Sequence, residues 1–244
     1  MTMTTPNLRE RLVVAMDFES ISEARDLWQV LRGYVFSVKV SLDIVLAADF
    51  ADFVEELREF DCRIIADLKA LQKPSAVKEI LIGIECLALD AVSVYFDREI
   101  IAIARAYCST SKLLTPILHT TLPQALLDRL SKPDGLGKLV AHRAMEAVKW
   151  GVDGVITSGL ELNDIGTEFG HSILCLVPGI RDSEIEVNFP DDQKRTVTVE
   201  SALSSGATYL IVGRPITRSG NARAEVIKFQ ARISQACCLS DYGI

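Results

Sequence analysis

The sequence predicts an α/β fold, a single-domain (β/α)8 TIM-type barrel. Three observations support this: short apolar runs rich in β-branched residues recur along the chain, helical periodicity fills the intervals between them, and 244 residues suit one barrel. The chain is 49% hydrophobic, enough for a large core, and no Pro-, Gly- or Ser-rich linker divides it. We assign residues 1–236 to the barrel and residues 237–244 to a C-terminal tail that lacks a pattern and is expected to fray.

The predicted strands are apolar runs of nearly continuous hydrophobicity, as expected for strands covered on both faces. They span residues 11–17, 35–40, 62–67, 90–95, 112–118, 152–157, 172–177 and 208–213. A barrel interior and an outer layer of helices would provide this cover. A doubly wound open sheet is the alternative architecture, but eight repeats of one kind overfill an ordinary open sheet.

Segments with amphipathic, helical spacing separate these strands. The clearest of them span residues 22–32, 50–60, 75–89, 97–107 and 198–207. Ser20 or Ser22 is expected to cap the first helix, and Thr198 the last, because their side-chain oxygens can accept free backbone N–H groups. Gly206 is a stop signal for the helix that begins at Thr198.

Charge and hydropathy narrow the range of partners. The net charge is −7 and the Lys and Arg residues are dispersed, which argues against nucleic acid as a partner. No apolar run approaches the roughly 20 residues that span a bilayer, and the first residues lack the apolar core of a signal peptide. We therefore predict a cytoplasmic protein without a membrane partner. Six cysteines lack C-x-x-C spacing, so we expect Cys62 and Cys175 to be reduced core residues.

Charged residues gather where the predicted strands end, which is where (β/α)8 barrels carry their reacting groups. Asp17, Lys39, Asp67 and Lys69 lie at or just after the ends of three successive predicted strands. Burying a lone charge is costly, so Lys39 and Lys69 are expected to neutralise Asp17 and Asp67 in an alternating network at the barrel mouth. The alternative is a set of solvated loop charges.

The last two strands are followed by features of an anion site. "PGIR" ends at Arg181, and in "VGRPI" Gly213 lets the backbone approach an anion while Arg214 offers a planar guanidinium. Phosphate sites recur at this place in barrels. The polar segment after Arg181 could fold over a ligand and bring Gln193 and Arg195 to a phosphate. An ordinary surface loop is the alternative.

An ordered series of motifs runs along nearly the whole chain: "RLVVAMD", "VKV", "IIADLK", "PGIR", "DQKR" and "ALSSGATYLIVGRPIT", with a final helix. This series resembles the orotidine 5'-monophosphate decarboxylase family. The resemblance implies cofactor-independent decarboxylation of orotidine 5'-monophosphate to uridine 5'-monophosphate in pyrimidine biosynthesis, a nucleotide monophosphate as ligand, and a homodimer. It also implies that no metal is used, because magnesium-dependent sister branches tend to carry a carboxylate where Lys39 stands.

The resemblance further implies roles for individual residues. Lys39, Asp67 and Lys69 would be catalytic: Asp67 presses its charge against the substrate carboxylate, and Lys69 stabilises and then protonates C6. A fixed ammonium aimed at a developing carbanion suits this chemistry, and grip on a remote phosphate supplies binding energy for it. The implied substrate-binding residues are Asp17 at the ribose, Gln72, His119 or Thr120 at the pyrimidine, and Arg181, Gln193, Gly213 and Arg214 towards the phosphate.

The reaction centre departs from the family pattern. The motif Asp-x-Lys-x-x-Asp reads Asp67, Lys69 and Gln72 here, Lys73 follows, and "SVYFD" replaces a histidine often found after the fourth strand. The missing carboxylate normally enters the neighbouring subunit's site, so its loss would lower the pKa of the lysines and weaken differential binding. Two alternatives therefore stay open: an enzyme acting on another phosphorylated ligand, and a non-catalytic nucleotide-binding paralogue.

Overall fold

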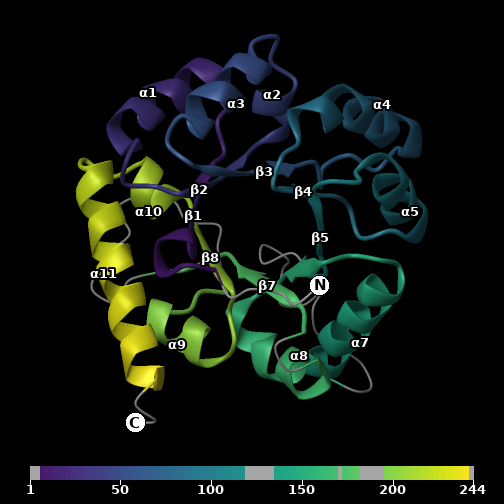
Figure 1. The fold of residues 1–244 in the computed structure, drawn as a ribbon. Coiled ribbons are helices and arrows are strands. Elements are labelled where there is room, and N and C mark those ends of the chain that lie inside the picture. The colour runs from purple at the N-terminus through teal and green to yellow at the C-terminus, as the bar shows by residue number, and fades with distance from the viewer. Residues whose placement is uncertain (1–5, 119–134, 170–171, 182–194, 242–244) are drawn as a thin grey trace.

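The computed structural model is a closed barrel of parallel strands inside a ring of helices (Figure 1). It describes residues 6–118, 135–169, 172–181 and 195–241. In these parts of the chain, eight strands follow one another in order around the ring, and β1 closes it by pairing with β8, with Leu12 opposite Leu210. The predicted single-domain (β/α)8 barrel is confirmed, and the open sheet is excluded because β1 and β8 would then have free edges.

The strands lie inside the apolar runs that predicted them. They are β1 Leu12–Met16, β2 Ser37–Val40, β3 Arg63–Asp67, β4 Ala91–Ser93, β5 Lys112–Pro116, β6 Gly154–Ile156, β7 Leu174–Val177 and β8 Tyr209–Val212. Their near-continuous hydrophobicity follows from burial on both faces, by the barrel interior on one side and by helices on the other.

The helices pack around the outside of the ring. They are α1 Ile21–Leu31, α2 Leu42–Val45, α3 Phe50–Arg58, α4 Pro74–Ile84, α5 Arg98–Tyr107, α7 Leu136–Lys149, α8 Leu162–Phe169, α9 Val199–Ser204, α10 Arg214–Thr217 and α11 Ala222–Asp241, with 3-10 turns η1 Leu8–Glu10, η2 Glu85–Leu87 and η3 Gly159–Glu161. Ser20 caps α1 and Thr198 caps α9, each accepting a backbone N–H at 3.2 Å. Gly206, with φ +99°, follows the end of α9.

The final helix is longer than the sequence predicts. Residues 237–241, assigned to the tail, continue α11 as far as Asp241. No glycine or proline interrupts the sequence between Ala222 and Asp241, and the half-buried Cys237 packs against the core. Within the described parts of the chain, no helix has the length and apolarity to cross a membrane.

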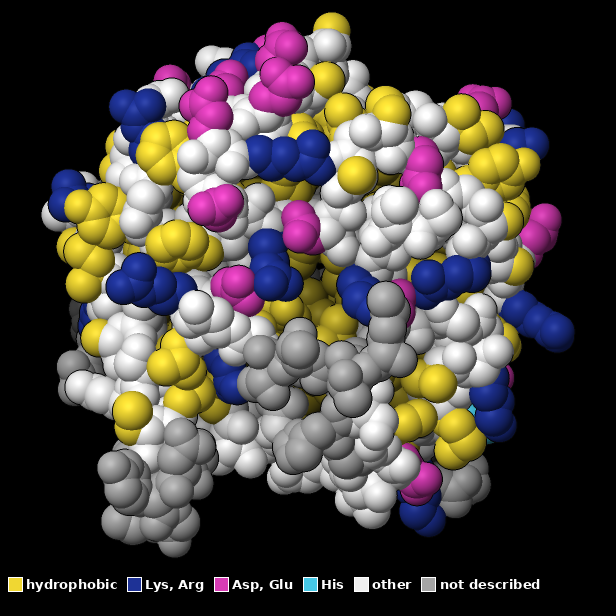
Figure 2. Space-filling view, in the orientation of Figure 1, with side chains coloured by type: hydrophobic (Ala, Val, Ile, Leu, Met, Phe, Trp, Pro, Cys, Tyr) yellow, Lys and Arg dark blue, Asp and Glu magenta, His cyan; other side chains and the backbone are white. Residues whose placement is uncertain are grey.

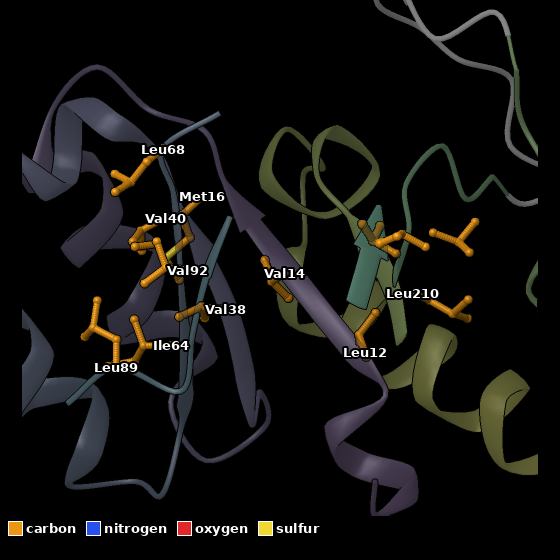
Figure 3. Close-up of a cluster of buried hydrophobic side chains, with 14 of the residues drawn as sticks. Leu12, Val14, Met16, Val38, Val40, Ile64, Leu68, Leu89, Val92 and Leu210 are labelled. Atoms are coloured by element: carbon orange, nitrogen blue, oxygen red, sulfur yellow. The ribbon is translucent and has the colours of Figure 1, made fainter. Parts of the chain in front are cut away.

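The strand backbone separates two layers of apolar side chains. Outward-facing residues such as Val14, Val38 and Ile64 pack towards the helices in a large cluster, part of which is drawn in Figure 3. The inward-facing cluster consists of Val13, Ala15, Ile65, Ala91, Leu114, Ile156, Leu176 and Ile211. Cys62 and Cys175 are buried and unbridged, as predicted, and burial raises the pKa of the Cys175 thiol to about 11.

Candidate active site

Strand alternation brings charged residues into the barrel. In β2, Val38 and Val40 belong to the outer apolar layer, so Lys39 between them points to the interior. Asp67 lies two residues after the inward-facing Ile65, and Asp17 two residues after Ala15, which gives both carboxylates the same inward parity. The period of two therefore gathers these three charges at one end of the barrel.

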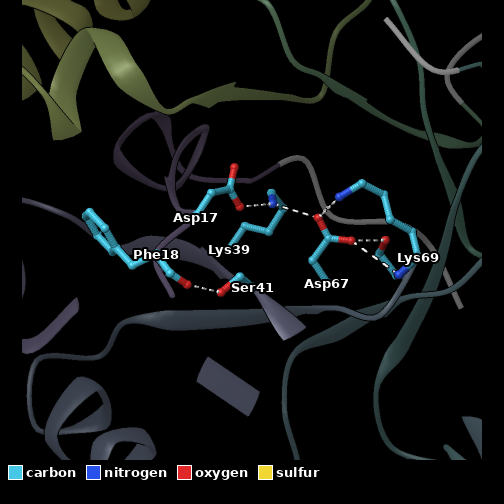
Figure 4. A network of polar contacts seen from close by, with 7 residues as sticks. Asp17, Phe18, Lys39, Ser41, Asp67 and Lys69 are labelled. Atoms are coloured by element: carbon cyan, nitrogen blue, oxygen red, sulfur yellow. Dashed lines mark hydrogen bonds and ion pairs between the residues drawn. The ribbon is translucent and has the colours of Figure 1, made fainter. Parts of the chain in front are cut away.

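The predicted alternating network of charges is present (Figure 4). Lys39 Nζ lies 2.8 Å from Asp17 Oδ1 and 2.7 Å from Asp67 Oδ2. Lys69 Nζ donates to the same oxygen, Asp67 Oδ2. The side chains of Lys39 and Asp67 are 7% and 3% exposed, whereas that of Lys69 is 38% exposed. Asp67 is thus buried between two ammonium groups, and only one of these is accessible from outside.

The charges at the barrel mouth hold one another in the ionised state. Burial alone would raise the pKa of Asp67, but the positive charges of Lys39 and Lys69 outweigh it, so its pKa lies well below the ordinary value. Burial alone would lower the pKa of Lys39, but Asp67 and Asp17 outweigh it and that pKa is raised. At neutral pH the buried pair therefore consists of a carboxylate and an ammonium.

Ser93 is a contact of Asp67 that the sequence did not reveal. Its hydroxyl donates to Asp67 Oδ1 at 3.1 Å, and the Lys69 backbone N–H reaches the same oxygen at 3.4 Å. Ser93 ends β4 and is paired in register with Asp67 on β3. It lies in the segment "SVYFD" that departs from the family pattern, and strand pairing was the signal that could have found it.

A cavity of about 420 Å³ opens above this network. Figure 2 shows a hollow with apolar depth and charged side chains around its rim. The cavity is lined by Ala15, Asp17, Phe18, Lys39, Asp67, Lys69, Pro116, Leu118, Ile156, Pro178, Gly179, Arg181, Ile211, Gly213, Arg214, Thr217 and Arg218. Strand-end charges and an apolar wall thus enclose one site, with a separate group of arginines contributed by the segments after β7 and β8.

The arginines lie where the sequence predicted an anion site. Arg214 begins α10 directly after Gly213, and Arg181 follows β7. A Cβ at Gly213 would meet Ala15 Cβ at 3.6 Å, an ordinary contact, so packing against β1 does not require glycine there. Arg218, at the end of α10, was not predicted, although it follows "GRPIT" by one residue and adds a further cation to the lining.

The other predicted site residues are distributed differently. Gln72 and the following Lys73 are exposed, and neither lines the cavity of this chain. Arg195, expected within reach of a phosphate, is instead buried against Glu161. His119, Thr120 and Gln193 lie outside the described residues. Of the implied substrate-binding set, the structure therefore brings Asp17, Arg181, Gly213 and Arg214 together with the catalytic candidates.

The carboxylates at this site form ion pairs with lysines. Among the residues that the structure describes, no group of three or more His, Cys, Asp and Glu side chains is arranged to hold a metal ion. Asp17 and Asp67 instead share the Lys39 ammonium. That the reaction uses no metal or other cofactor stays a prediction.

Sequence comparisons identify relatives along most of the chain. The profile of the "Orotidine 5'-phosphate decarboxylase / HUMPS family" matches residues 10–229. An orotidine 5'-phosphate decarboxylase of Methylococcus capsulatus is 33% identical over 225 residues, which cover 92% of this chain and 92% of the relative. Another, from Maridesulfovibrio salexigens, is 32% identical over 214 residues, covering 84% of this chain and 91% of the relative.

The fold is also similar to solved structures. The crystal structure of orotidine 5'-phosphate decarboxylase from Lactobacillus acidophilus has a TM-score of 0.72 at 23% sequence identity, covering 92% of this chain and 99% of that chain. At this identity the likeness concerns the fold alone. The matched profile and the relatives above 30% identity show the family as well as the fold. This chain belongs to the orotidine 5'-phosphate decarboxylase / HUMPS family.

Proposed function

We propose that this chain catalyses the cofactor-independent decarboxylation of orotidine 5'-monophosphate to uridine 5'-monophosphate, the activity for which its relatives are named. One observation carries the proposal. Asp67 is buried between the ammonium groups of Lys39 and Lys69, at the base of a cavity with arginines elsewhere in its lining. A fixed carboxylate beside a fixed ammonium suits a reaction in which a carboxylate leaves and a carbanion forms.

In the proposed reaction, the bond between C6 of the pyrimidine and the carboxylate breaks, carbon dioxide leaves, and the electron pair stays on C6. The negative charge of Asp67 repels the substrate carboxylate, and this repulsion is relieved as the carbon dioxide forms. Lys69 Nζ stabilises the electron pair and then transfers its proton to C6. The Lys69 amine afterwards recovers a proton from solvent, which its exposure of 38% allows.

The charge of the cavity supports an anionic substrate. Its described lining contains five Lys or Arg side chains and two carboxylates. The substrate carries one carboxylate and a phosphate of about −1.5 to −2 at neutral pH. We assign the ribose to Asp17 and Lys39, and the phosphate to Arg214 and the Gly213 backbone, with Arg181, Gln193 and the segment around His119 or Thr120 completing the binding site.

We also propose that the enzyme is a homodimer. Gln72 takes the place of the family's second aspartate, and in this chain it is exposed and outside the cavity lining. A residue in that position can reach a reaction centre when a second copy packs against it. We therefore assign residue 72 to the active site of the partner subunit, whereas Asp67 and Lys69 act in the active site of their own chain.

The test is decarboxylation of orotidine 5'-monophosphate by the purified protein, followed by ultraviolet absorbance. Lys69→Ala is the matched blank. The variant is expected to fold, because Asp67 keeps its ion pair with Lys39 and only the more exposed of its two lysines is removed. We expect turnover by the wild type and a loss of at least about 10²–10³-fold in the variant, as for other removed electrostatic stabilisers. Equal rates in the two proteins would refute the proposed function.

A further inference from the structure

A buried ion pair joins η3 to the stretch that leads into α9. Arg195 Nη2 donates to Glu161 Oε1, and these residues are 8% and 6% exposed. Burial lowers the pKa of Arg195. Glu161 Oε2 and Arg195 Nε find no hydrogen-bond partner within the described residues. Two charges are thus held out of water by one mutual contact, an arrangement that is a poor source of stability by itself.

The stretch that begins at Arg195 runs beside the end of β7. The Val197 N–H donates to the Gly179 carbonyl at 3.2 Å, and the Arg181 N–H donates to the Val197 carbonyl at 3.0 Å. Gly179 and Arg181 line the cavity, whereas Glu161 and Arg195 are not part of the lining. Two backbone hydrogen bonds therefore join the stretch that carries Arg195 to the wall of the cavity.

Close packing fixes the same stretch a second time. Gly159, the first residue of η3, is so near to Val197 that an added Cβ would lie 2.5 Å from Val197 Cγ2. Val197 itself is 9% exposed. The turn η3 thus holds residues 195–197 at two points, through the backbone of Gly159 and through the carboxylate of Glu161. A shift of Glu161 would be transmitted to the residues that pair with Val197.

We propose that Glu161 is a positioning residue for the candidate active site. Through Arg195 it fixes the strand-like pairing of Val197 with Gly179 and Arg181, and so sets the position of the cavity wall that these two residues form. This inference rests on the proposed function, because this wall belongs to the end of the cavity assigned to the phosphate. Glu161 touches neither substrate nor reacting atoms in this role.

The test compares Glu161→Gln with a matched control, Asp153→Asn. Asp153 precedes β6 at the opposite end of the barrel, where it pairs with Arg105 Nη2 at 2.7 Å and accepts the Leu113 N–H at 2.8 Å. Both changes remove one carboxylate charge from an ion pair next to β6. Affinity for uridine 5'-monophosphate is measured by calorimetry, and exchange of the Arg181 amide hydrogen by hydrogen–deuterium exchange.

We expect Glu161→Gln to weaken binding of uridine 5'-monophosphate by about tenfold or more, since small displacements of binding groups have effects of this size. Exchange at Arg181 should accelerate in the same variant. Asp153→Asn should leave both quantities within about twofold of the wild type, an interval well inside one tenfold step. An unchanged affinity in Glu161→Gln, or unchanged exchange at Arg181, would overturn the positioning role.

A double variant tests the same role in case Glu161→Gln fails to fold. Glu161→Leu with Arg195→Met removes both buried charges, and such replacements are often neutral or stabilising. It should fold and still bind uridine 5'-monophosphate more weakly, because the directional contact is lost; wild-type affinity would count against the role. If the wild type binds this nucleotide but does not decarboxylate orotidine 5'-monophosphate, the proposed function fails while the comparison of affinities still decides the role of Glu161.

Discussion

At the scale of single residues, Asp67 is the charge on which the network depends. It contacts Lys39 and Lys69 at once, so Asp67→Asn leaves Lys39, whose side chain is 7% exposed, with Asp17 as its remaining charge partner among the described residues. Breaking a fully buried pair costs about 3–5 kcal/mol. Because Asp17 stays in place, we expect a smaller loss of about 2 kcal/mol in the free energy of unfolding, measured by urea denaturation. Unchanged stability would contradict this account of the network.

The same residue predicts how stability depends on pH. The pKa of Asp67 is lowered from its ordinary 3.8, so its contribution is present above 3.8 and is lost as the pH falls through the folded-state value. The pKa of Lys39 is raised from its ordinary 10.5, so its contribution is present below 10.5 and is lost at higher pH. We expect the difference in unfolding free energy between wild type and Asp67→Asn to be constant between these values and to vanish in acid. A difference that changes steadily around neutral pH would contradict the assignment.

Sequence reasoning at this scale succeeded where one rule sufficed. Charges at successive strand ends, together with the cost of burying a lone charge, predicted the network of Asp17, Lys39, Asp67 and Lys69. Sequence reasoning missed contacts that depend on neighbouring elements. Ser93, for example, reaches Asp67 because β3 and β4 are in register. Arg195 was expected near a phosphate, but its burial against Glu161 depends on packing of η3 that no local pattern reports.

At the scale of elements, two glycines with opposite surroundings give a paired prediction. A Cβ at Gly154 in β6 would lie 2.7 Å from Leu174 Cβ and 2.9 Å from the Leu174 carbonyl oxygen. Gly154→Ala should therefore cost about 1–3 kcal/mol through overpacking. Apart from its chain neighbours and the backbone of α8 itself, no heavy atom of the described residues lies within 4 Å of a Cβ at Gly166. Gly166→Ala should stabilise by about 0.5–1 kcal/mol through helix propensity.

Thermal and urea unfolding of both variants test this pair. The strand substitution should lower the midpoint and the helix substitution should raise it. A stabilised Gly154→Ala variant would mean that β6 and β7 are less tightly packed than the structure shows.

Strands were the elements most fully predicted from the sequence. Each strand is buried on both faces, so it is recognisable in the sequence as a short apolar run such as "IIAD" or "YLIV". The helices α7 and α8 were not predicted: α7 follows Gly135, which has no side chain to cap it, and α8 continues directly from the turn η3. The length of α11 was underestimated because its last turns have no apolar periodicity, although Cys237 still contacts the core.

At the scale of the whole molecule, Gln72 tests the proposed pairing of two subunits. Gln72→Asp restores the family's carboxylate at an exposed position outside the cavity of its own chain. If this residue completes the site of a second copy, the variant should decarboxylate orotidine 5'-monophosphate at least about tenfold faster, consistent with the contribution of one well-placed charge.

Light scattering after gel filtration should give twice the mass of the chain for both proteins. Mixing the variant with Lys69→Ala provides a control. In a mixed dimer the restored carboxylate would enter the site that lacks Lys69, so the gain in rate should be lost there. A monomeric protein, or a variant no faster than the wild type, would show that position 72 does not act across an interface.

Closure of the barrel between β1 and β8 also bears on how the protein is synthesised. Of the described strands, translation delivers β1 first, but its partner on one side is β8, which is delivered last. Until then β1 exposes unpaired N–H and C=O groups along one edge, and such long-range pairing slows folding. Asp17, Lys39, Asp67 and Lys69 can assemble on the first strands during this time, whereas Arg214 arrives together with β8. The nascent chain can therefore assemble the four charges of the candidate active site before it presents the arginine that follows β8.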